Sequence, residues 1–264
     1  MTHDTTAAGG ADFALSFDTV ATQYATARPS YPPELLDTVE QLAGLDPGGL
    51  RGATALDVGA GTGIATRLLR ERGARAIAVE PGPGMGAELR RTLPDVPLVR
   101  ALGDALPFAD ASVDLVTYAQ SWHWTDPARS VPEALRVLRP GGALALWWNV
   151  PDPDVEWAAA QEARLQARLP GYHAHGISSD APRLIAGLGL TPAPTPVFRQ
   201  LHWTRRIPVD LHLAHLGSRS YFAVMGPQES RPVLEDERAH LLRRFPDGVV
   251  EDAYALDLTV VRRP

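Results

Sequence analysis

Three acidic residues follow successive apolar segments of the chain, at positions where they could hold one ligand together. Asp57 precedes a glycine-rich turn by two residues, Glu80 ends the next apolar segment, and Asp104 comes just after the third. A carboxylate can accept two hydrogen bonds from a ribose diol, as we expect of Glu80, or accept from an amino group, as we expect of Asp57 and Asp104. The apolar residues 106–108 would flank an adenine ring. These residue types predict a ligand with an amino group, a ribose and an adenine.

The glycine-rich turn predicts close contact between the backbone and that ligand. Gly59, Gly61 and Gly63 carry no Cβ that could collide with a bound molecule, and the N–H groups of the following helix would point at it. A dinucleotide fingerprint needs its third glycine one position later, where Ile64 stands. A pyrophosphate would also be poorly placed beside Asp57. S-adenosylmethionine, which has all three parts and no phosphate, therefore fits better than NAD.

The elements that must position these residues alternate along the first part of the chain. Short apolar runs predict strands at 53–58, 75–80, 96–101, 113–119 and 142–149. Helical spacing of apolar residues predicts helices at 32–45, 64–72, 83–93 and 127–138. This alternation predicts an α/β fold with a doubly wound, parallel sheet. After Pro151 we expect helices at 155–169, 182–188, 209–216 and 232–245, and strands at 197–207 and 253–263.

Residues 120–124 emerge where the fourth strand ends, the edge at which open α/β sheets bind ligands. If the predicted S-adenosylmethionine donates its methyl group, transfer from its sulfonium requires an aligned nucleophile, exclusion of water and, for some acceptors, removal of a proton. His123 is the candidate base because histidine titrates near neutral pH, and Trp122 and Trp124 could form apolar or cation–π walls. A second hypothesis stays open: His123 only orients the loop, positions the acceptor or binds the cofactor's carboxylate. An acceptor that is itself a carboxylate would need no base.

Longer stretches carry a family resemblance. They are ALDVGAGTG, AVEPGPGM, GDALPFADASVDLV, AQSWHWTD and EALRVLRPGG, together with the upstream segment FDTVATQYATARPSYPPELLD. From about residue 17 to residue 149 the chain resembles the class I S-adenosylmethionine-dependent methyltransferases, and within them the small-molecule group similar to trans-aconitate methyltransferase-like (type 11) enzymes. The resemblance implies a Rossmann-like sheet of seven strands with the last strand antiparallel. It also implies methyl transfer to oxygen, nitrogen or carbon of a small organic acceptor, for which a specialised metabolite is one hypothesis.

The resemblance also implies roles for individual residues. Gly59, Ala60 and Gly61 would lie along the methionine part of the cofactor, and Tyr24 and Arg28 would close over its carboxylate. The cofactor-binding residues implied in this way are Tyr24, Arg28, Asp57, Gly59, Ala60, Gly61, Gly63, Glu80, Pro81, Met85, Asp104, Ala105, Leu106 and Gln120. The candidate acceptor-binding residues are Trp122, His123, Trp124, Tyr172, His173 and Tyr221.

The length of 264 residues suits one methyltransferase domain with additions. We expect an N-terminal helical cap at 12–50, a cofactor-binding core at 53–150, an acceptor lid with the remaining sheet at 151–251, and a final strand at 252–264. Neither a signal peptide nor a membrane span is visible, which predicts a cytoplasmic protein, as a monomer or homodimer.

Composition excludes several kinds of chemistry. The chain has no cysteine, and all 25 of its cationic residues are arginine, so thiolate metal sites, cysteine nucleophiles and lysine Schiff bases are impossible. The net charge of −6 argues against nucleic acid or an anionic membrane as a partner. Two histidine pairs, 173/175 and 212/215, have the spacing of metal ligands, but neither has an acidic third ligand at a convincing position, so no metal is expected.

Two functions other than methyl transfer remain as alternatives. An NAD-dependent oxidoreductase is disfavoured by Ile64 and by the roughly 50 residues that precede the first strand. A regulator or pseudo-enzyme that binds S-adenosylmethionine without transferring its methyl group is not excluded by any residue.

Overall fold

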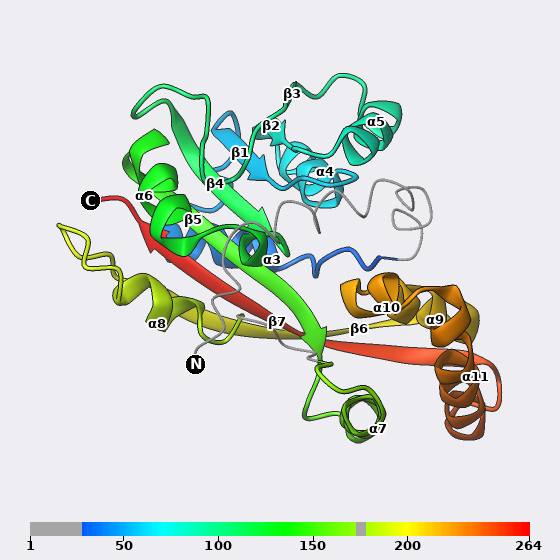
Figure 1. The fold of residues 1–264 in the computed structure, drawn as a ribbon. Helices are drawn as coiled ribbons and strands as arrows, with labels where there is room; N and C mark the ends of the chain where they lie inside the picture. The colour runs from blue at the N-terminus through cyan, green and yellow to red at the C-terminus, as the bar shows by residue number, and fades with distance from the viewer. Residues whose placement is uncertain (1–27, 173–177) are drawn as a thin grey trace, which may run out of the picture.

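The computed structural model contains a twisted sheet of seven strands in the order β3-β2-β1-β4-β5-β7-β6 (Figure 1). It describes residues 28–172 and 178–264. Five strands are parallel: β1 (Thr54–Val58), β2 (Arg75–Val79), β3 (Leu98–Val99), β4 (Val113–Ala119) and β5 (Leu138–Pro151). The helices α4 (Ile64–Glu71), α5 (Pro83–Thr92) and α6 (Pro127–Val137) connect them. This arrangement confirms the predicted α/β class.

The last strand is inserted between two others. β7 (Val249–Arg262) pairs with β5 on one side and with β6 (Val197–Pro208) on the other, antiparallel to both. The expectation of a seven-stranded sheet with an antiparallel last strand is therefore confirmed. β5 and β7 are each 14 residues long, so the sheet extends well past the parallel core. Around that extension lie α7 (Glu156–Arg168), α9 (Val209–Gly217), α10 (Ser220–Met225) and α11 (Pro227–Arg244) (Figure 1).

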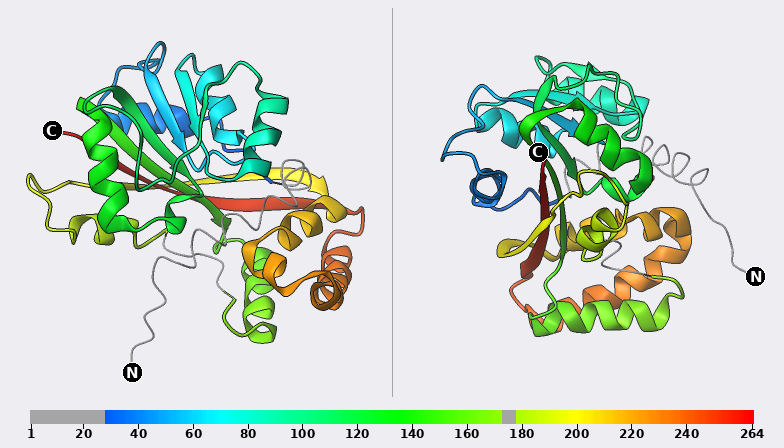
Figure 2. Two further views of the ribbon diagram at one scale, coloured as in Figure 1. Left: turned by 45° about the horizontal axis from the view of Figure 1, so that its top comes forward. Right: turned by 90° about the vertical axis from the view of Figure 1, so that its left-hand side faces the viewer.

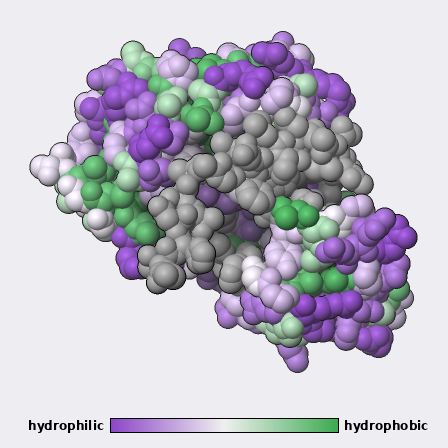
Figure 3. Space-filling model, viewed as in Figure 1, coloured by the Kyte–Doolittle hydropathy of each residue, from purple (hydrophilic) through white to green (hydrophobic). Residues whose placement is uncertain are grey.

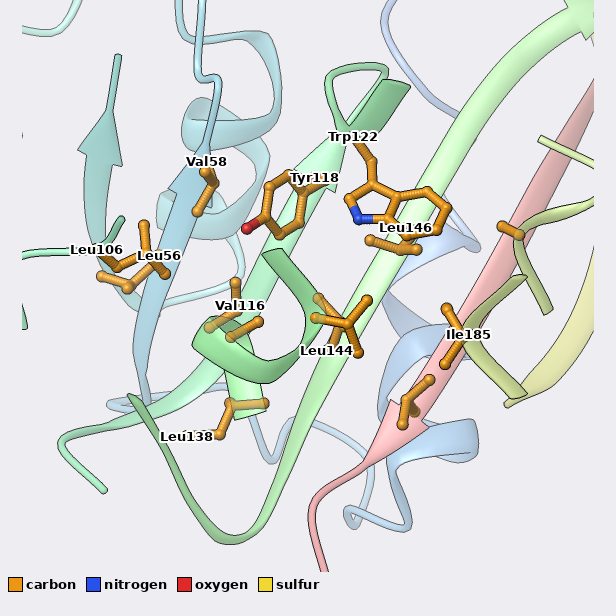
Figure 4. Packing of buried hydrophobic residues seen from close by; sticks show 14 of the residues in the cluster. Leu56, Val58, Leu106, Val116, Tyr118, Trp122, Leu138, Leu144, Leu146 and Ile185 are labelled. Carbon is orange, nitrogen blue, oxygen red and sulfur yellow. The ribbon is translucent and has the colours of Figure 1, made fainter. Parts of the chain in front are cut away.

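Helices lie on both faces of the sheet (Figure 2), and an apolar layer packs against each face. One layer contains Trp148 and Leu144 of β5 with residues of α6 and α8 (Ala181–Ala186) (Figure 4). The opposite layer contains Trp147 with residues of α3 (Leu35–Ala43) and α4. The neighbouring residues Trp147 and Trp148 lie in opposite layers because successive side chains of a strand point to opposite faces of the sheet. Burial on both faces explains why β1, β4 and most of β5 are largely apolar rather than alternating.

The structure differs from the predicted elements in a few places. β3 has two residues instead of six, α10 was not predicted, and α11 begins at Pro227 rather than at residue 232. Pro232 lies inside α11. Because proline is typical of the first turn of a helix and uncommon in its interior, the sequence pattern predicted that the helix begins at this residue. In the described part of the chain, no helix is both long enough and apolar enough to cross a membrane.

Candidate cofactor and acceptor site

The glycine-rich turn lies between the end of β1 and the start of α4 and is left-handed at every glycine. The φ angles are 68° at Gly59, 57° at Gly61 and 90° at Gly63. A Cβ on Gly59 would lie 2.5 Å from Cβ of Ser121, whereas a Cβ on Gly61 would meet nothing within 4 Å. Gly59 is thus required by packing, and Gly61 borders open space that a ligand can fill.

Glu80 lies beside this open space. Its carboxylate accepts the backbone N–H of Gly61 at 2.8 Å and that of Gly82 at 2.7 Å, and the residue is 6% exposed. Among the described residues, the buried hydroxyl of Thr62 in the same turn has no hydrogen-bond partner. An open cradle, an adjacent carboxylate and an unpaired hydroxyl fit the methionine and ribose parts of S-adenosylmethionine, although the individual contacts stay predictions.

Asp57 is completely buried beneath the turn. Its two carboxylate oxygens accept hydrogen bonds from the hydroxyls of Thr66, at 2.5 Å, and Thr117, at 3.2 Å. Burial raises the pKa of Asp57 to about 6, although both hydroxyls act in the opposite direction. Neither threonine was predicted as a site residue. The signals in the sequence were a polar side chain within an apolar strand and another in the first turn of a helix. An amino group of the cofactor near Asp57 stays a prediction.

The predicted amino group near Asp57 can be tested by measuring how ligand affinity depends on pH. The pKa of folded Asp57 is raised, so its contribution to stability is largest below the ordinary value and falls as pH rises through about 6. A nearby ammonium of the ligand would favour the charged carboxylate, and binding would release a proton. We therefore expect the affinity for S-adenosylhomocysteine to fall about tenfold between pH 7 and pH 5. Calorimetric titration of wild type and Asp57→Asn checks this. The variant should show no such dependence, and a pH-independent wild type would place the amino group elsewhere.

Asp104 follows Gly103, where an added Cβ would lie 3.1 Å from Val58 at the end of β1 and 3.0 Å from Tyr118 of β4. The neighbouring carbonyl of Gly103 accepts the hydroxyl of Tyr118 at 2.5 Å, which fixes this segment against the sheet. The Asp104 side chain is 14% exposed and lies 3.4 Å from Nη1 of Arg129, a partner that the sequence analysis did not identify. Leu106 is buried in the core, and Met85 is buried on α5. The position is compatible with the predicted adenine contacts, which no observation tests.

The turn after β4 lies at the carboxyl edge of the parallel strands and contains a strained residue. Gln120 is left-handed, with φ 55°, which is uncommon outside glycine, and its N–H donates to the carbonyl of Trp147 at 2.8 Å. The hydroxyl of Ser121 donates to the carbonyl of Val58 at 2.5 Å, which holds this turn against the end of β1. The loop therefore leaves the sheet directly beside the glycine-rich turn.

Trp122 is buried beneath the loop. Its ring has no exposed surface, packs in the apolar layer of Figure 4 and donates its indole N–H to Ser130 at 2.9 Å. A residue in this position supports the loop from below, and its role as a wall of the acceptor pocket stays a prediction. The sequence pattern could not distinguish the two roles, because both need an aromatic residue at the end of a strand. Trp124 is half-buried and lies beside His123, with 4.5 Å between the ring centroids.

His123 is exposed on the loop that follows β4, and the surrounding protein partly desolvates its ring. Its Nδ1 lies 3.2 Å from the indole N–H of Trp148, which can only donate. Nδ1 is therefore the acceptor, and the proton of the neutral ring lies on Nε2. Desolvation and then the charge of Arg28 lower the pKa of His123 to about 4, so the ring is neutral at pH 7. In this arrangement His123 offers an N–H donor, which favours the positioning hypothesis over the base.

Two tyrosines predicted to bind the acceptor have packing roles. Tyr172 is buried, donates its hydroxyl to Glu162 at 3.0 Å and packs against Tyr221. Tyr221 is half-buried and donates to the carbonyl of Pro170 at 2.9 Å. These contacts join α10 to the end of α7 and leave Tyr172 only 3% exposed, and its contact with an acceptor stays a prediction. The predicted residues Tyr24 and His173 lie outside the described residues.

Arg28 of the expected cap donates to the carbonyl of Ser218 at 3.1 Å, just after α9. Its predicted contact with the cofactor's carboxylate stays a prediction. A group with metal-ligand residue types, formed by Asp152, Asp154 and His202, was not predicted. Within it, Nδ1 of His202 lies 2.7 Å from Asp152, and this hydrogen bond accounts for the contact.

Comparison with known sequences connects this site to one family. The model of the methyltransferase domain matches residues 56–146, from β1 into β5. Over 250 residues the chain is 36% identical to an uncharacterized methyltransferase of Mycobacterium tuberculosis, a match that covers 95% of each chain. An uncharacterized methyltransferase of Schizosaccharomyces pombe is 35% identical over 143 residues, 54% of this chain and 55% of that one.

Solved structures agree with these sequence matches. A protein of Anaeromyxobacter dehalogenans, provisionally described as a type II methyltransferase, superimposes with a TM-score of 0.57 at 26% identity, covering 89% of this chain and 96% of that one. The fold also matches a provisionally described methyltransferase of Bacillus halodurans, with a TM-score of 0.54 at 20% identity, covering 88% and 99%. The trans-aconitate-like subgroup stays a prediction. Because the strand order, the glycine-rich turn and a relative matched over nearly its whole length agree, the chain belongs to the class I S-adenosylmethionine-dependent methyltransferases.

Proposed function

We propose that the protein transfers the methyl group of S-adenosylmethionine to a small organic acceptor bound between the carboxyl edge of the parallel strands and the helices α9 to α11. The observation that carries this proposal is the open cradle at Gly61, with Glu80 beside it and His123 on the adjacent loop. Figure 3 shows a recess between the body of the sheet and the lobe that these helices form. A recess of this kind suits a small molecule, and a specialised metabolite remains our proposed class.

The chain's own residues would mainly align and shield the reactants. When bound, S-adenosylmethionine supplies a methyl group that is already activated by the positive charge on sulfur. The chain has no cysteine and no lysine, so neither residue type can act as a nucleophile. Nε2–H of His123 can hold an oxygen or nitrogen of the acceptor, or the carboxylate of the cofactor, in a fixed direction. Trp124, next to the His123 ring, can help to exclude water.

Calorimetric titration of the full chain tests the proposal. We expect S-adenosylmethionine and S-adenosylhomocysteine to bind and NAD(H) not to bind, because Ile64 replaces the third glycine of a dinucleotide fingerprint. Binding of NAD(H) without either sulfur compound would overturn the proposal. Binding of S-adenosylmethionine without methyl transfer to any small molecule of a metabolite extract would indicate a regulator instead.

A further inference from the structure

Residues 102–110, between β3 and β4, form a segment without helix or strand that carries two of the predicted adenine contacts, Asp104 and Leu106. Its apolar side chains anchor it to the core. Leu106 is 3% exposed and lies in the apolar layer of Figure 4, and Phe108 packs against the same layer. The backbone N–H and C=O groups of such a segment also need partners. Several of these partners come from one side of α6.

Glu133 and Arg136 of α6 hold the backbone of Leu106 at both of its polar groups. Oε1 of Glu133 accepts the N–H of Leu106 at 2.8 Å, and Nη2 of Arg136 donates to the carbonyl of Leu106 at 3.1 Å. Nη1 of Arg136 donates to the carbonyl of Phe108 at 2.9 Å and to the carboxylate of Asp110 at 2.6 Å. One side of a single helix therefore fixes the segment at three of its residues.

Glu133 and Arg136 also hold each other. They are three positions apart on the helix, and Nε and Nη2 of Arg136 donate to the two carboxylate oxygens of Glu133, both at 2.8 Å. These bonds lower the pKa of Glu133 although burial opposes them, and the N–H of Leu106 acts in the same direction. Arg136 thus makes five hydrogen bonds, one for each N–H of a guanidinium. A lysine, with three donors, cannot reproduce this arrangement.

The carboxylate of Asp104 depends on the backbone for its position. Its ion pair with Arg129 of α6 is 3.4 Å long and the Arg129 side chain is 61% exposed, so this contact contributes little. The backbone is fixed more firmly on both sides of Asp104. The carbonyl of Gly103 accepts the hydroxyl of Tyr118, and the polar groups of Leu106 are held by α6.

We propose that Glu133 and Arg136 are positioning residues that give the site its selectivity for adenine, because they hold the segment so that Asp104 meets the 6-amino group of the base. The inference rests on the proposed function, since it assigns selectivity within that cofactor site. A 6-amino group donates to a carboxylate, whereas the 6-oxo group of a hypoxanthine base presents lone pairs to it. A carboxylate that is held in place cannot move away from a 6-oxo group, so it rejects the wrong base. A carboxylate on a mobile segment can turn to solvent, and the selectivity is lost.

Hydrogen exchange of the full chain without ligand tests whether the segment is held in this way. In Arg136→Lys we expect the N–H of Leu106 to exchange at least about tenfold faster, since the bonds that enclose it are weakened. The increase should exceed that of the amides of β4, which report on the stability of the whole fold. Arg91→Lys is the matched control, because Arg91 pairs with Glu88 at the same spacing within α5.

Calorimetric titration with S-adenosylhomocysteine and S-inosylhomocysteine, which differ at position 6 of the purine, tests the selectivity. Wild type should bind the adenosyl compound about 10- to 150-fold more tightly, as expected for a hydrogen bond to a charged group. In Arg136→Lys and Glu133→Gln the affinity for the adenosyl compound should fall, and the difference between the two ligands should shrink to about threefold or less. Glu133→Gln leaves one acceptor oxygen where three N–H donors converge. A merely structural role would weaken both ligands by the same factor, and Arg91→Lys should keep the wild-type ratio.

The outcomes separate this inference from the proposed function. Unchanged exchange at Leu106 in Arg136→Lys would overturn the inference, and so would a wild-type affinity ratio in both variants. Equal binding of the two ligands by wild type would also overturn it, while leaving the proposed function intact. Failure of wild type to bind S-adenosylhomocysteine would contradict the proposed function and the inference together.

Discussion

Gly59→Ala is expected to destabilise the protein by about 2–5 kcal/mol and to abolish binding of S-adenosylmethionine. The new Cβ would lie 2.5 Å from Cβ of Ser121, closer than real Cβ contacts allow, and Ser121 is itself tied to the carbonyl of Val58. A left-handed φ costs a residue with a Cβ about 1–2 kcal/mol, and overpacking in a tight site costs about 1–3 kcal/mol more. Urea denaturation measures the stability, and calorimetry with S-adenosylhomocysteine measures the binding.

Substitutions at two other glycines separate the effect of backbone strain from the effect of the contact with Ser121. Gly61→Ala and Gly48→Ala introduce the same kind of left-handed strain, at φ 57° and 79°, where a Cβ meets nothing within 4 Å. Each should therefore lose only about 1–2 kcal/mol of stability. Only Gly61→Ala should also lose cofactor binding, since its methyl group enters the cradle. If Gly61→Ala binds S-adenosylhomocysteine like wild type, the cofactor does not run along this turn. If Gly59→Ala is as stable as Gly48→Ala, the contact with Ser121 is not the constraint.

The second large effect is expected at Glu80. Glu80→Ala should weaken binding of S-adenosylmethionine by about 1.5–3 kcal/mol, or about 10- to 150-fold, as expected when a charged hydrogen-bond acceptor is lost. The carboxylate also aligns the N–H groups of Gly61 and Gly82, so part of the loss comes from a less ordered turn. Glu80→Gln, which keeps one acceptor oxygen, should retain part of the affinity. Calorimetric titration gives all three dissociation constants.

Glu88→Ala is the matched control for this measurement. Glu88 is the next acidic residue along the chain and is bonded to Arg91 on α5. Its removal should leave cofactor affinity unchanged. An unaltered affinity in Glu80→Ala would show that the ribose is held elsewhere, and an equal loss in both variants would point to a general effect on folding.

The sequence predicted secondary structure well where the local residue pattern matches the burial of the element. β1 and β4 were predicted to within one residue, because strands buried on both faces are short, apolar and bounded by turn residues. The glycine-rich turn was equally readable, since three glycines at fixed spacing after such a strand have few other uses. Side-chain roles were harder to predict. Trp122 and Trp124 are two residues apart in one motif, yet the first is fully buried and the second is partly exposed.

The sequence by itself determined the alternation of strands and helices, the turn at the cofactor site and the acidic residues around it, because each depends on neighbours within a few positions. Only the tertiary structure decided which nitrogen of His123 carries the proton. That proton is placed by Trp148, which is 25 residues away from His123 in the sequence. Hydrogen-bond direction inside a protein depends on partners that the fold brings together, so no local pattern in the sequence can show it.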